Sequence, residues 1–342
     1  MNAAGTDAAG NAAVSAAPLL QVNDLRVQYR LSRPAWRPWE PAPRVSAVDG
    51  VSFTLDAGQT LGVVGESGCG KSTLARALLQ LLPAGADALC TGQVLWNGAV
   101  VPQGRPGVLR REAQMVFQDP LASLDPRMTV AQIIEEPLRI HERQLDAAAR
   151  QGKVREMMDR VGLSPRQLNR YPHEFSGGQC QRIGIARALI LGPRLLVCDE
   201  PVSALDVSIQ AQILNLLADL QRETGVAVLF IAHDLAVVRH VSQRVLVMYL
   251  GRVVESASRD ALYTTPRHPY TRALLSAVPL PDPKHERAKV IELLQGDIPS
   301  PLNPPSGCAF RTRCPLAQAR CAAQTPALRT DEQGHAVACH FA

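Results

Sequence analysis

Two glycine-rich segments of the 342-residue chain have the composition of phosphate-binding turns. The first, Gly65-Glu-Ser-Gly-Cys-Gly-Lys71-Ser72, has the G-x-x-x-x-G-K-[ST] spacing of a phosphate-binding loop. Its glycines let backbone N–H groups close around an anion, while Lys71 and the Ser72 hydroxyl are suited to the β- and γ-phosphates and to Mg²⁺. An apolar strand precedes the motif and a helical segment follows it, which favours a nucleotide site over a chance glycine turn.

The second segment, Ser176-Gly177-Gly178-Gln179, opens a predicted helix more than a hundred residues further along the chain. Its unpaired N–H groups and the positive end of the helix dipole are suited to a second anion. Because a single nucleotide site rarely needs two such turns, we interpret them as complementary half-sites. The sequence therefore predicts a dimer.

Two adjacent carboxylates follow a predicted strand of the core. The apolar run Leu195–Cys198 ends in Asp199 and Glu200. Downstream of a phosphate loop, Asp199 would hold Mg²⁺ through water, and Glu200 would orient or deprotonate the water that attacks the γ-phosphate. The alternative is a pair of solvated carboxylates at a strand end. The buried strand and the upstream loop favour the catalytic interpretation.

Two more polar residues follow short apolar runs. His233 ends the predicted strand Val226–Ala232, and Gln118 follows Met115–Phe117. His233 would contact the γ-phosphate and link it to Glu200, and Gln118 would touch Mg²⁺ and the attacking water. A lone histidine is more often structural and a lone glutamine is more often a polar loop residue, so both assignments depend on the whole set.

Composition and charge exclude several other classes of function. Apolar runs such as Val245–Leu250 are strand-sized, whereas a transmembrane helix needs roughly 20 apolar residues, so we expect no membrane span. The formal charge of +5 comes from interspersed residues without a long Lys/Arg run, so no nucleic-acid partner is predicted. Residues 1–18 are rich in Ala, Gly and Ser and carry no Lys or Arg, which predicts a disordered cytoplasmic tail rather than a signal peptide.

The elements that must position these residues follow from hydrophobic periodicity. Residues 25–29 and 51–55 alternate apolar and polar side chains, which predicts antiparallel strands with one buried face. Residues from about 96 to 185 are more helical and charged, which indicates an inserted α-helical subdomain or simply solvated helices. Strands that alternate with helices after the loop predict a mainly parallel sheet, with functional residues at the carboxyl ends of its strands.

Beyond Pro266 the composition changes. Prolines at nine positions between 266 and 305 oppose long regular elements, so this tail should lie extended over the core or form a small appendage. Four of the eight cysteines crowd the last 35 residues, at Cys308, Cys314, Cys321 and Cys339. Four thiolates suit zinc or an iron–sulfur cluster, although the absence of C-x-x-C pairs disfavours a zinc ribbon. A cytosolic position argues against disulfides.

The motifs together closely resemble those of the nucleotide-binding subunits of ABC transporters, over about residues 20 to 255. They are Gly65–Ser72, Gln118, Phe175-Ser-Gly-Gly-Gln179, Leu195–Glu200, Ser203-Ala-Leu-Asp206 and His233. The resemblance implies a head-to-tail dimer, in which each ATP lies between the phosphate loop of one subunit and the Ser-Gly-Gly-Gln turn of the other. Phe175 replaces the commoner leucine, a conservative change that should not impair phosphate binding.

Carried over residue by residue, the resemblance implies three groups of site residues. The catalytic residues are Glu200, His233 and Gln118. ATP and Mg²⁺ are bound by Gly65, Glu66, Ser67, Gly68, Cys69, Gly70, Lys71, Ser72, Thr73, Gln118 and Asp199. The ATP of the partner is contacted by Ser176, Gly177, Gly178, Gln179 and Asp206. Adenine stacks on an aromatic near the N-terminus, for which Tyr29 is the best-placed candidate and Trp36 and Trp39 are the alternatives.

The C-terminal segment extends the resemblance to nearly the whole chain. Residues 268–279, the proline-rich residues 299–305 and the terminal cysteines resemble the C-terminal extension of oligopeptide and dipeptide importer ATPases. Phe117–Asp125 and Phe175–Gly184 look most like the F-type subunits of that family. The resemblance implies a heterodimer with a paralogous D-type ATPase, two membrane permease subunits and a periplasmic or lipoprotein peptide-binding protein. The chain would then lie peripherally on the cytoplasmic face of the bacterial inner membrane.

The implied function is ATP hydrolysis that energises oligopeptide import, and two alternatives stay open. The same kind of ATPase would serve dipeptide, nickel or glutathione import, since substrate choice lies in other subunits. A soluble ABC ATPase acting on nucleic acid, ribosomes or iron–sulfur assembly is disfavoured, because the chain has one cassette, no coiled-coil insertion and no strong basic patch. Related importer ATPases carry a [4Fe–4S] cluster on such a tail, which favours a cluster over zinc.

These expectations define the architecture that we predict. It is an α/β P-loop NTPase fold of the ABC type, with an antiparallel β subdomain, an inserted α-helical subdomain and a proline- and cysteine-rich C-terminal extension. The predicted boundaries are 1–18 for the tail, 19–262 for the ATPase domain with its helical subdomain at about 96–185, and 263–342 for the extension with its four-cysteine motif.

Overall fold

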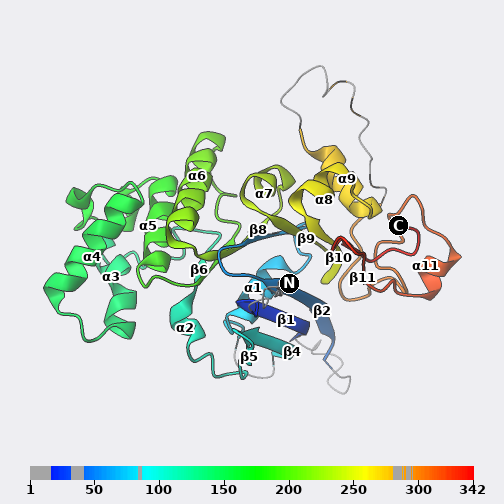
Figure 1. Cartoon of the computed structure of the whole chain (residues 1–342), viewed down its shortest axis with the longest axis horizontal. Coiled ribbons are helices and arrows are strands. Elements are labelled where there is room, and N and C mark those ends of the chain that lie inside the picture. Colours follow the sequence, from blue (N-terminus) through cyan, green and yellow to red (C-terminus); the bar gives the residue numbers. More distant parts are fainter. Residues whose placement is uncertain are drawn as a thin grey trace, which may run out of the picture.

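The computed structural model describes residues 17–31, 42–83, 87–279, 287, 289, 294 and 296–342. Two β-sheets with different strand directions and several helices form this part of the molecule (Figure 1). The tail expected over residues 1–18 lies almost wholly outside the described residues, as do Trp36 and Trp39. None of the helices in the described ranges combines the length and apolar character that a membrane span requires.

The larger sheet contains the strands that the sequence predicts to carry functional residues at their ends. In spatial order its strands are β11 (Arg329–Thr330), β12 (Ala336–Val337), β10 (Arg252–Ser258), β9 (Arg244–Tyr249), β3 (Thr60–Val64), β8 (Ala227–Ala232), β7 (Leu195–Asp199) and β6 (Ala113–Val116). The strands from β9 to β6 are parallel, whereas β10, β12 and β11 pair antiparallel at the other edge. Strands β3, β7 and β8 are buried throughout, as a parallel sheet covered on both faces requires.

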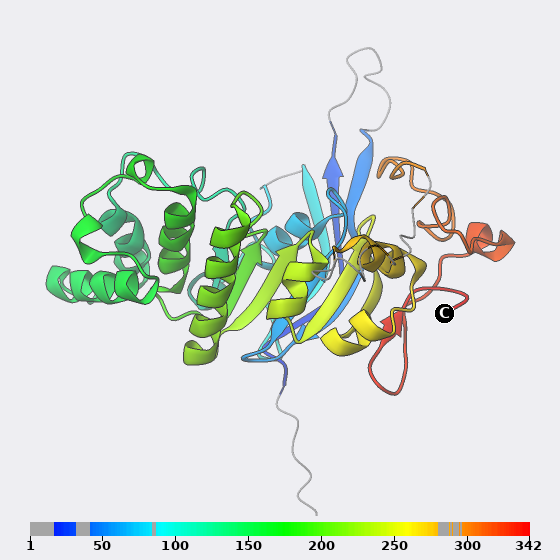
Figure 2. The same cartoon turned by 90° about the horizontal axis from the view of Figure 1, so that it is seen from above.

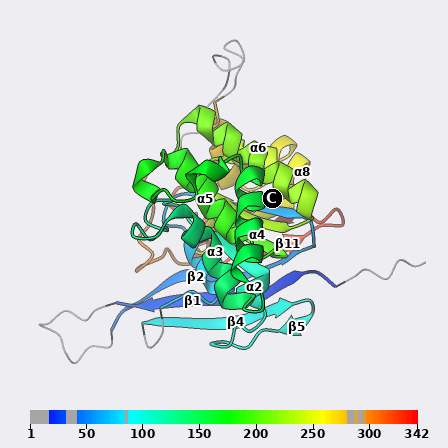
Figure 3. The ribbon, with the colours of Figure 1, turned by 90° about the vertical axis from the view of Figure 1, so that its left-hand side faces the viewer.

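The smaller sheet is antiparallel, which confirms the strands predicted over residues 25–29 and 51–55. Its strands lie in the order β2 (Arg44–Leu55), β1 (Leu20–Arg30), β4 (Ala88–Trp96) and β5 (Ala99–Val100). Viewed along the long axis of the molecule, this sheet forms a layer of its own beneath the helices (Figure 3).

The helix after the phosphate loop, α1 (Lys71–Leu78), packs between the two sheets. Leu74 and Leu78 of this helix are buried in one apolar cluster with Val27 of β1 and Leu229 of β8. Both sheets therefore determine where the N-terminus of α1 lies. Since that N-terminus carries the end of the glycine-rich loop, the packing of the core sets the position of the candidate phosphate site.

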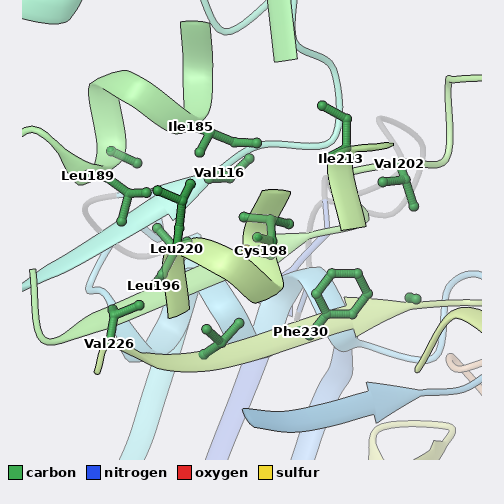
Figure 4. Close-up of a cluster of buried hydrophobic side chains, with 14 of the residues drawn as sticks. Val116, Ile185, Leu189, Leu196, Cys198, Val202, Ile213, Leu220, Val226 and Phe230 are labelled. Carbon is green, nitrogen blue, oxygen red and sulfur yellow. The ribbon is translucent and has the colours of Figure 1, made fainter. Parts of the chain in front are cut away.

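The other face of the larger sheet is covered by α6 (Val207–Thr224) and α7 (Leu235–Val241). Cys198 and Phe230, from neighbouring strands, lie in a buried cluster with Ile213 and Leu220 of α6 (Figure 4). Because these apolar residues recur at helical spacing along α6, one stripe of the helix faces the sheet. This packing fixes the ends of β7 and β8, where Asp199, Glu200 and His233 are found.

A lobe of helices lies at one end of the molecule (Figure 2). Its elements are α3 (Val130–His141), α4 (Ala147–Arg160), the 3₁₀ turns η1 (Pro165–Gln167) and η2 (Pro172–Glu174), and α5 (Gly177–Leu189). The predicted start of this subdomain near residue 96 is wrong. Between Trp96 and Val130 the chain forms β5, the short helix α2 (Leu109–Glu112) and β6. Strand β5 pairs with β4 of the smaller sheet, and β6 pairs with β7 of the larger sheet.

The C-terminal extension lies at the end opposite the helical lobe (Figures 1 and 2). Helix α8 (Arg259–Thr264) spans its predicted start at residue 263, and α9 (Pro269–Ala277) follows, with Pro269 in the first helical turn, which tolerates proline. Further along, the extension forms α11 (Ala319–Ala323). Its last strand, β12, pairs with β10 and so enlarges the main sheet. The fully buried Glu255 of β10 accepts hydrogen bonds from the His268 N–H at 3.0 Å and pairs with His335 Nε2 at 2.7 Å, which holds this strand in place.

Candidate active site

The phosphate loop connects β3 to α1 and has the backbone conformation that only glycine adopts without strain. Gly65, Gly68 and Gly70 have φ of 155°, 78° and 103°. A Cβ at Gly65 would lie 2.3 Å from the Met248 carbonyl oxygen, and one at Gly70 would lie 2.0 Å from that of Ala47. Both sheets therefore approach the loop so closely that only hydrogen fits at these two positions.

Lys71 is buried at the start of α1, and its ammonium group turns back into the loop. Its Nζ donates hydrogen bonds to the carbonyl oxygens of Gly65 at 2.8 Å and Glu66 at 3.1 Å. Ser67 and Gly68 at the tip are exposed, while Cys69 is buried among apolar side chains and burial raises the pKa of its thiol. The tip of the loop is thus exposed, the Lys71 ammonium lies buried against the loop carbonyls, and the Cys69 side chain belongs to the core.

The side-chain oxygens of Ser72 and Asp199 lie together beside the loop. The Ser72 hydroxyl donates a hydrogen bond of 2.8 Å to Asp199 Oδ1, and Asp199 is only 2 % exposed. Burial raises the pKa of Asp199, and the hydrogen bond from Ser72 and the charge of Arg76 act in the opposite direction. A hydroxyl and a carboxylate of this kind are the donors that Mg²⁺ prefers, so the residues fit the expected cation.

Glu200 lies at the centre of the polar residues at the strand ends. Its carboxylate accepts a hydrogen bond from Gln118 Nε2 at 3.2 Å, lies 3.3 Å from His233 Nδ1 and lies 3.8 Å from Lys71 Nζ. Its backbone has a φ of 45°, a left-handed conformation that residues other than glycine adopt at an energetic cost. Such backbone strain concentrates at functional sites. The structure therefore brings together the Lys, Gln, Glu and His that the sequence analysis selected from four separate segments.

The Ser-Gly-Gly-Gln turn forms the N-terminus of α5 on the helical lobe. Ser176 Oγ accepts a hydrogen bond from the Gln179 N–H at 3.3 Å, and Gln179 Oε1 accepts one from the Ser176 N–H at 3.0 Å, which is a capping box. Ser176 and Gly177 are exposed, whereas a Cβ at Gly178 would lie 2.5 Å from a methyl of Ile209. The turn therefore exposes the positive end of a helix.

Asp206 lies beside this turn, at the N-terminus of α6. It is exposed and accepts a hydrogen bond from the Ile209 N–H at 3.0 Å. Within the residues that the structure describes, no hydrogen bond or ion pair joins Asp206 or the Ser-Gly-Gly-Gln turn to Lys71 or Glu200. The second group of predicted contacts thus makes no direct bond to these two residues, and its role in binding the ATP of a partner stays a prediction.

Tyr29 lies in β1, opposite Val45 of β2 and Ala88 of β4. It is partly buried against the core cluster that contains α1. Two residues along β2 from Val45 is Ala47, whose carbonyl faces Gly70 of the phosphate loop. Tyr29 therefore lies one strand away from the contact between the smaller sheet and the loop, and its role in binding adenine stays a prediction.

A cavity of about 750 Å³ opens between the helical lobe and the ends of β6 and β7. Its lining includes Arg76, Phe117, Gln118, Glu136, Arg187 and Asp199. Arg187 of α5 is partly buried, which lowers its pKa, and its Nη1 donates a 2.6 Å hydrogen bond to the Ser123 carbonyl. The loop after Gln118 is thereby joined to the helix that begins with the Ser-Gly-Gly-Gln turn.

Two residues of the extension contact the phosphate loop, and the sequence analysis missed both. The Glu66 N–H donates a 2.9 Å hydrogen bond to the Tyr270 hydroxyl, and the Arg313 guanidinium binds the Glu66 carboxylate at 2.7 and 3.0 Å. A lone tyrosine and a lone arginine more than 200 positions from the loop give no periodic or motif signal. Only the folded chain reveals these contacts.

The four terminal cysteines are free thiols in the extension. The Cys308 N–H donates a 2.7 Å hydrogen bond to the Cys321 carbonyl, and burial raises the pKa of the Cys308 thiol, with Cys321 and Cys339 raising it further. Among the described residues, no group of three or more His, Cys, Asp or Glu side chains is arranged to hold a metal ion. The expected metal centre therefore has its four candidate ligands in one segment but not its coordination geometry.

The phosphate loop, the carboxylates at the ends of parallel strands, the antiparallel subdomain and the helical lobe together define an ABC-type ATPase. Solved structures of this class agree: the cassette cbiO1 of Clostridium perfringens, part of an ABC transporter complex, superposes with a TM-score of 0.60 at 25% identity over 72% of this chain and 91% of that one. The ATP-binding cassette MJ0796, a dimer bound to ADP and Pi after hydrolysis, gives 0.60 at 26% identity over 70% and 98%.

The sequence comparisons are more specific. Residues 48–203 match the ABC transporter family model, and residues 254–321 match that of the oligopeptide/dipeptide transporter C-terminal region. The oligopeptide transport ATP-binding protein OppF of Escherichia coli is 56% identical over 94% of this chain and 95% of its own length. The di/tripeptide transport ATP-binding protein DppF of Pseudomonas aeruginosa is 52% identical over 95% and 98%. The chain belongs to the family of oligopeptide and dipeptide ABC transporter ATP-binding proteins.

Proposed function

We propose that the chain binds MgATP at the phosphate loop and hydrolyses it to energise the import of oligopeptides through a multisubunit ABC transporter. The observation that carries this proposal is the position of Glu200, which contacts Gln118, His233 and Lys71 beside the Ser72–Asp199 pair. A base, a cation to neutralise phosphate and two oxygen ligands for Mg²⁺ thus lie within one site, as phosphoryl transfer to water requires. Similarity to OppF supports oligopeptides as the cargo.

In the proposed reaction, Glu200 orients the attacking water and accepts its proton. Gln118 and His233 hydrogen bond to the same carboxylate, so they fix its direction and offer a second contact to the water and the γ-phosphate. Lys71 exchanges its loop carbonyl partners for the β- and γ-phosphates. Mg²⁺, held by Ser72 and by Asp199 through water, would neutralise the charge that develops on the phosphates.

The Ser176–Gln179 turn and Asp206 contact the ATP of a second ATPase subunit in this proposal. Their exposure and the free helix N-terminus support a role in trans. Head-to-tail pairing with a paralogous D-type subunit would then complete two sites, each with one phosphate loop and one Ser-Gly-Gly-Gln turn. The solved cassette dimer bound to ADP and Pi is consistent with pairing in this class.

We further propose that the 750 Å³ cavity receives a segment of a membrane permease subunit. Gln118, Asp199 and residues of helix α3 all line it, so a segment bound there would contact the candidate ATP site and the helical lobe together. Two permeases and a peptide-binding protein complete the transporter. The chain then lies peripherally on the cytoplasmic face of the inner membrane.

The cysteines of the extension form the last part of the proposal: they bind a [4Fe–4S] cluster, with Zn²⁺ as the alternative. Four free thiols in one segment and the influence of neighbouring thiols on the pKa of Cys308 support it. Anaerobic purification with iron, sulfide and zinc analysis tests it, and the recovery of stoichiometric zinc without iron would contradict the cluster.

The decisive experiment for the function is purification of the chain with its membrane partners, followed by reconstitution in vesicles with candidate binding proteins. We expect ATP hydrolysis that an oligopeptide-loaded binding protein stimulates and that Lys71→Ala abolishes. Stimulation by dipeptide, nickel or glutathione instead would redirect the cargo; the similarity to DppF favours di- and tripeptides among these. Recovery with ribosomes or DNA alone would favour a soluble ABC ATPase.

A further inference from the structure

The C-terminal extension reaches the phosphate loop through a bidentate ion pair. Arg313 Nη1 lies 2.7 Å from Glu66 Oε2, and Nη2 lies 3.0 Å from Oε1. The Arg313 side chain is 8 % exposed and that of Glu66 is 23 % exposed. A pair with this geometry and burial is worth more than a surface ion pair, because both hydrogen bonds are charge-assisted and little solvent screens them.

A second segment of the extension contacts the same loop residue. The Glu66 N–H donates to the hydroxyl of the fully buried Tyr270 on α9. Tyr270 packs against Tyr249 of the main sheet and against Phe310, three residues before Arg313, with ring centroids 4.8 and 5.4 Å away. The backbone and the side chain of Glu66 are thus held by two parts of the extension that also pack on each other.

The charge of Glu66 gives this contact a consequence for nucleotide binding. Glu66 is the one acidic residue in the segment Gly65–Ser72, which is shaped to receive phosphate. An unpaired carboxylate there would repel the triphosphate, whereas a carboxylate bound to a guanidinium adds no net charge. The guanidinium of Arg313, like that of any arginine, is charged throughout the physiological pH range, so it can neutralise the carboxylate.

We propose that Arg313 is a positioning residue of the ATP site, because it holds the Glu66 carboxylate away from the phosphates and neutralises its charge. Nucleotide affinity then depends on how the cysteine-containing segment packs against the phosphate loop. This inference rests on the proposed function, since it concerns the same phosphate loop. It gives the extension a role in ATP binding and places Arg313, between Cys308 and Cys314, as the link.

A double-mutant cycle on the full chain tests the proposal, with Mg²⁺ and ATP as the probe and calorimetric titration as the readout. Arg313→Ala should weaken ATP binding by about tenfold, because it leaves the Glu66 carboxylate unpaired. In the Glu66→Gln background the same change should weaken binding by less than about twofold, because no charge remains to be neutralised. Arg313→Lys keeps the charge and should restore most of the affinity.

Arg311→Ala is the matched control, because Arg311 lies in the same loop but bonds to Ser306 of its own segment. The thermal midpoint without nucleotide separates loss of ATP contacts from loss of the fold. Unchanged affinity in Arg313→Ala, or an equal loss in both Glu66 backgrounds, would overturn the inference while leaving the proposed function intact. Absence of ATP binding in the wild-type chain would overturn the proposed function and the inference with it.

Discussion

The hydroxyl of Ser72 donates a 2.8 Å hydrogen bond to the carboxylate of Asp199, although the two residues are 127 positions apart. Ser72 lies in the first turn of α1 and Asp199 ends β7, so the bond joins the helix after the phosphate loop to the central sheet. Burial of the carboxylate in this contact has a cost, since it raises the pKa of Asp199. The pair therefore combines two oxygens of the kind that Mg²⁺ prefers with a carboxylate whose charged form is locally unfavourable.

Asp199→Asn should stabilise the nucleotide-free chain and abolish Mg²⁺-dependent ATP binding. Because its pKa is raised, Asp199 binds a proton more tightly in the folded chain than in the unfolded chain. The free energy of unfolding therefore falls as the pH rises from the ordinary pKa of aspartate to the raised pKa of the folded state. Asparagine removes this loss, and we expect a gain of about 1 kcal/mol at pH 7. Thermal unfolding across pH measures it. The exposed cap Asp206→Asn serves as control, and equal curves for wild type and Asp199→Asn would contradict the prediction.

Glu200→Gln should preserve ATP binding and reduce hydrolysis at this subunit's phosphate loop by about 100-fold or more, as expected for loss of a general base. The amide can still contact Gln118 and His233, so the fold of the site should persist. Single-turnover ATP hydrolysis by the assembled transporter checks it. Glu223→Gln is the control, since Glu223 forms an exposed ion pair with Arg160, and it should behave as wild type. Near-normal turnover in Glu200→Gln would show that another group acts as the base.

Ser176→Arg should leave ATP binding by the isolated chain unchanged but reduce hydrolysis by the paired ATPases about 100-fold, because a bulky cation replaces a phosphate donor contributed in trans. The readouts are ATP affinity of the full chain alone and turnover of the complex. Ser164→Arg provides the comparison, since Ser164 is another exposed cap on the same lobe. A loss of ATP affinity in the isolated chain would place the turn in the chain's own site instead.

Tyr29→Ala should weaken ATP binding by about 1–3 kcal/mol if its ring stacks on adenine, while Tyr29→Phe should bind normally because it keeps the ring. Competition with inorganic triphosphate separates base contacts from phosphate contacts, since triphosphate affinity should not change. Tyr171→Ala, at an exposed tyrosine of the helical lobe, is the control. Equal ATP affinity in Tyr29→Ala and wild type would reassign adenine to another aromatic.

Local sequence patterns predicted much of the candidate site. The spacing of Gly65, Gly70 and Lys71 specifies a turn with positive φ followed by a helix, and these conformations depend mainly on neighbouring residues. Apolar runs that end in Asp199 and His233 predicted the ends of parallel strands, because burial on both faces demands such runs. The start of the helical lobe was misplaced, since the four-residue strand Ala113–Val116 is too short to distinguish from a helical segment.

By itself, then, the sequence determined the two glycine-rich turns and the polar residues at the strand ends, because each motif is local and chemically distinctive; that the turns act as two half-sites stays a prediction. The tertiary structure alone decided that β12 extends the main sheet, that Glu255 is buried beside His335, and that Arg313 binds Glu66 across 247 positions. Such contacts arise from the packing of distant segments, which leaves no periodicity in the chain. For that reason, the connection between the cysteine-containing extension and the phosphate loop becomes visible only in the folded protein.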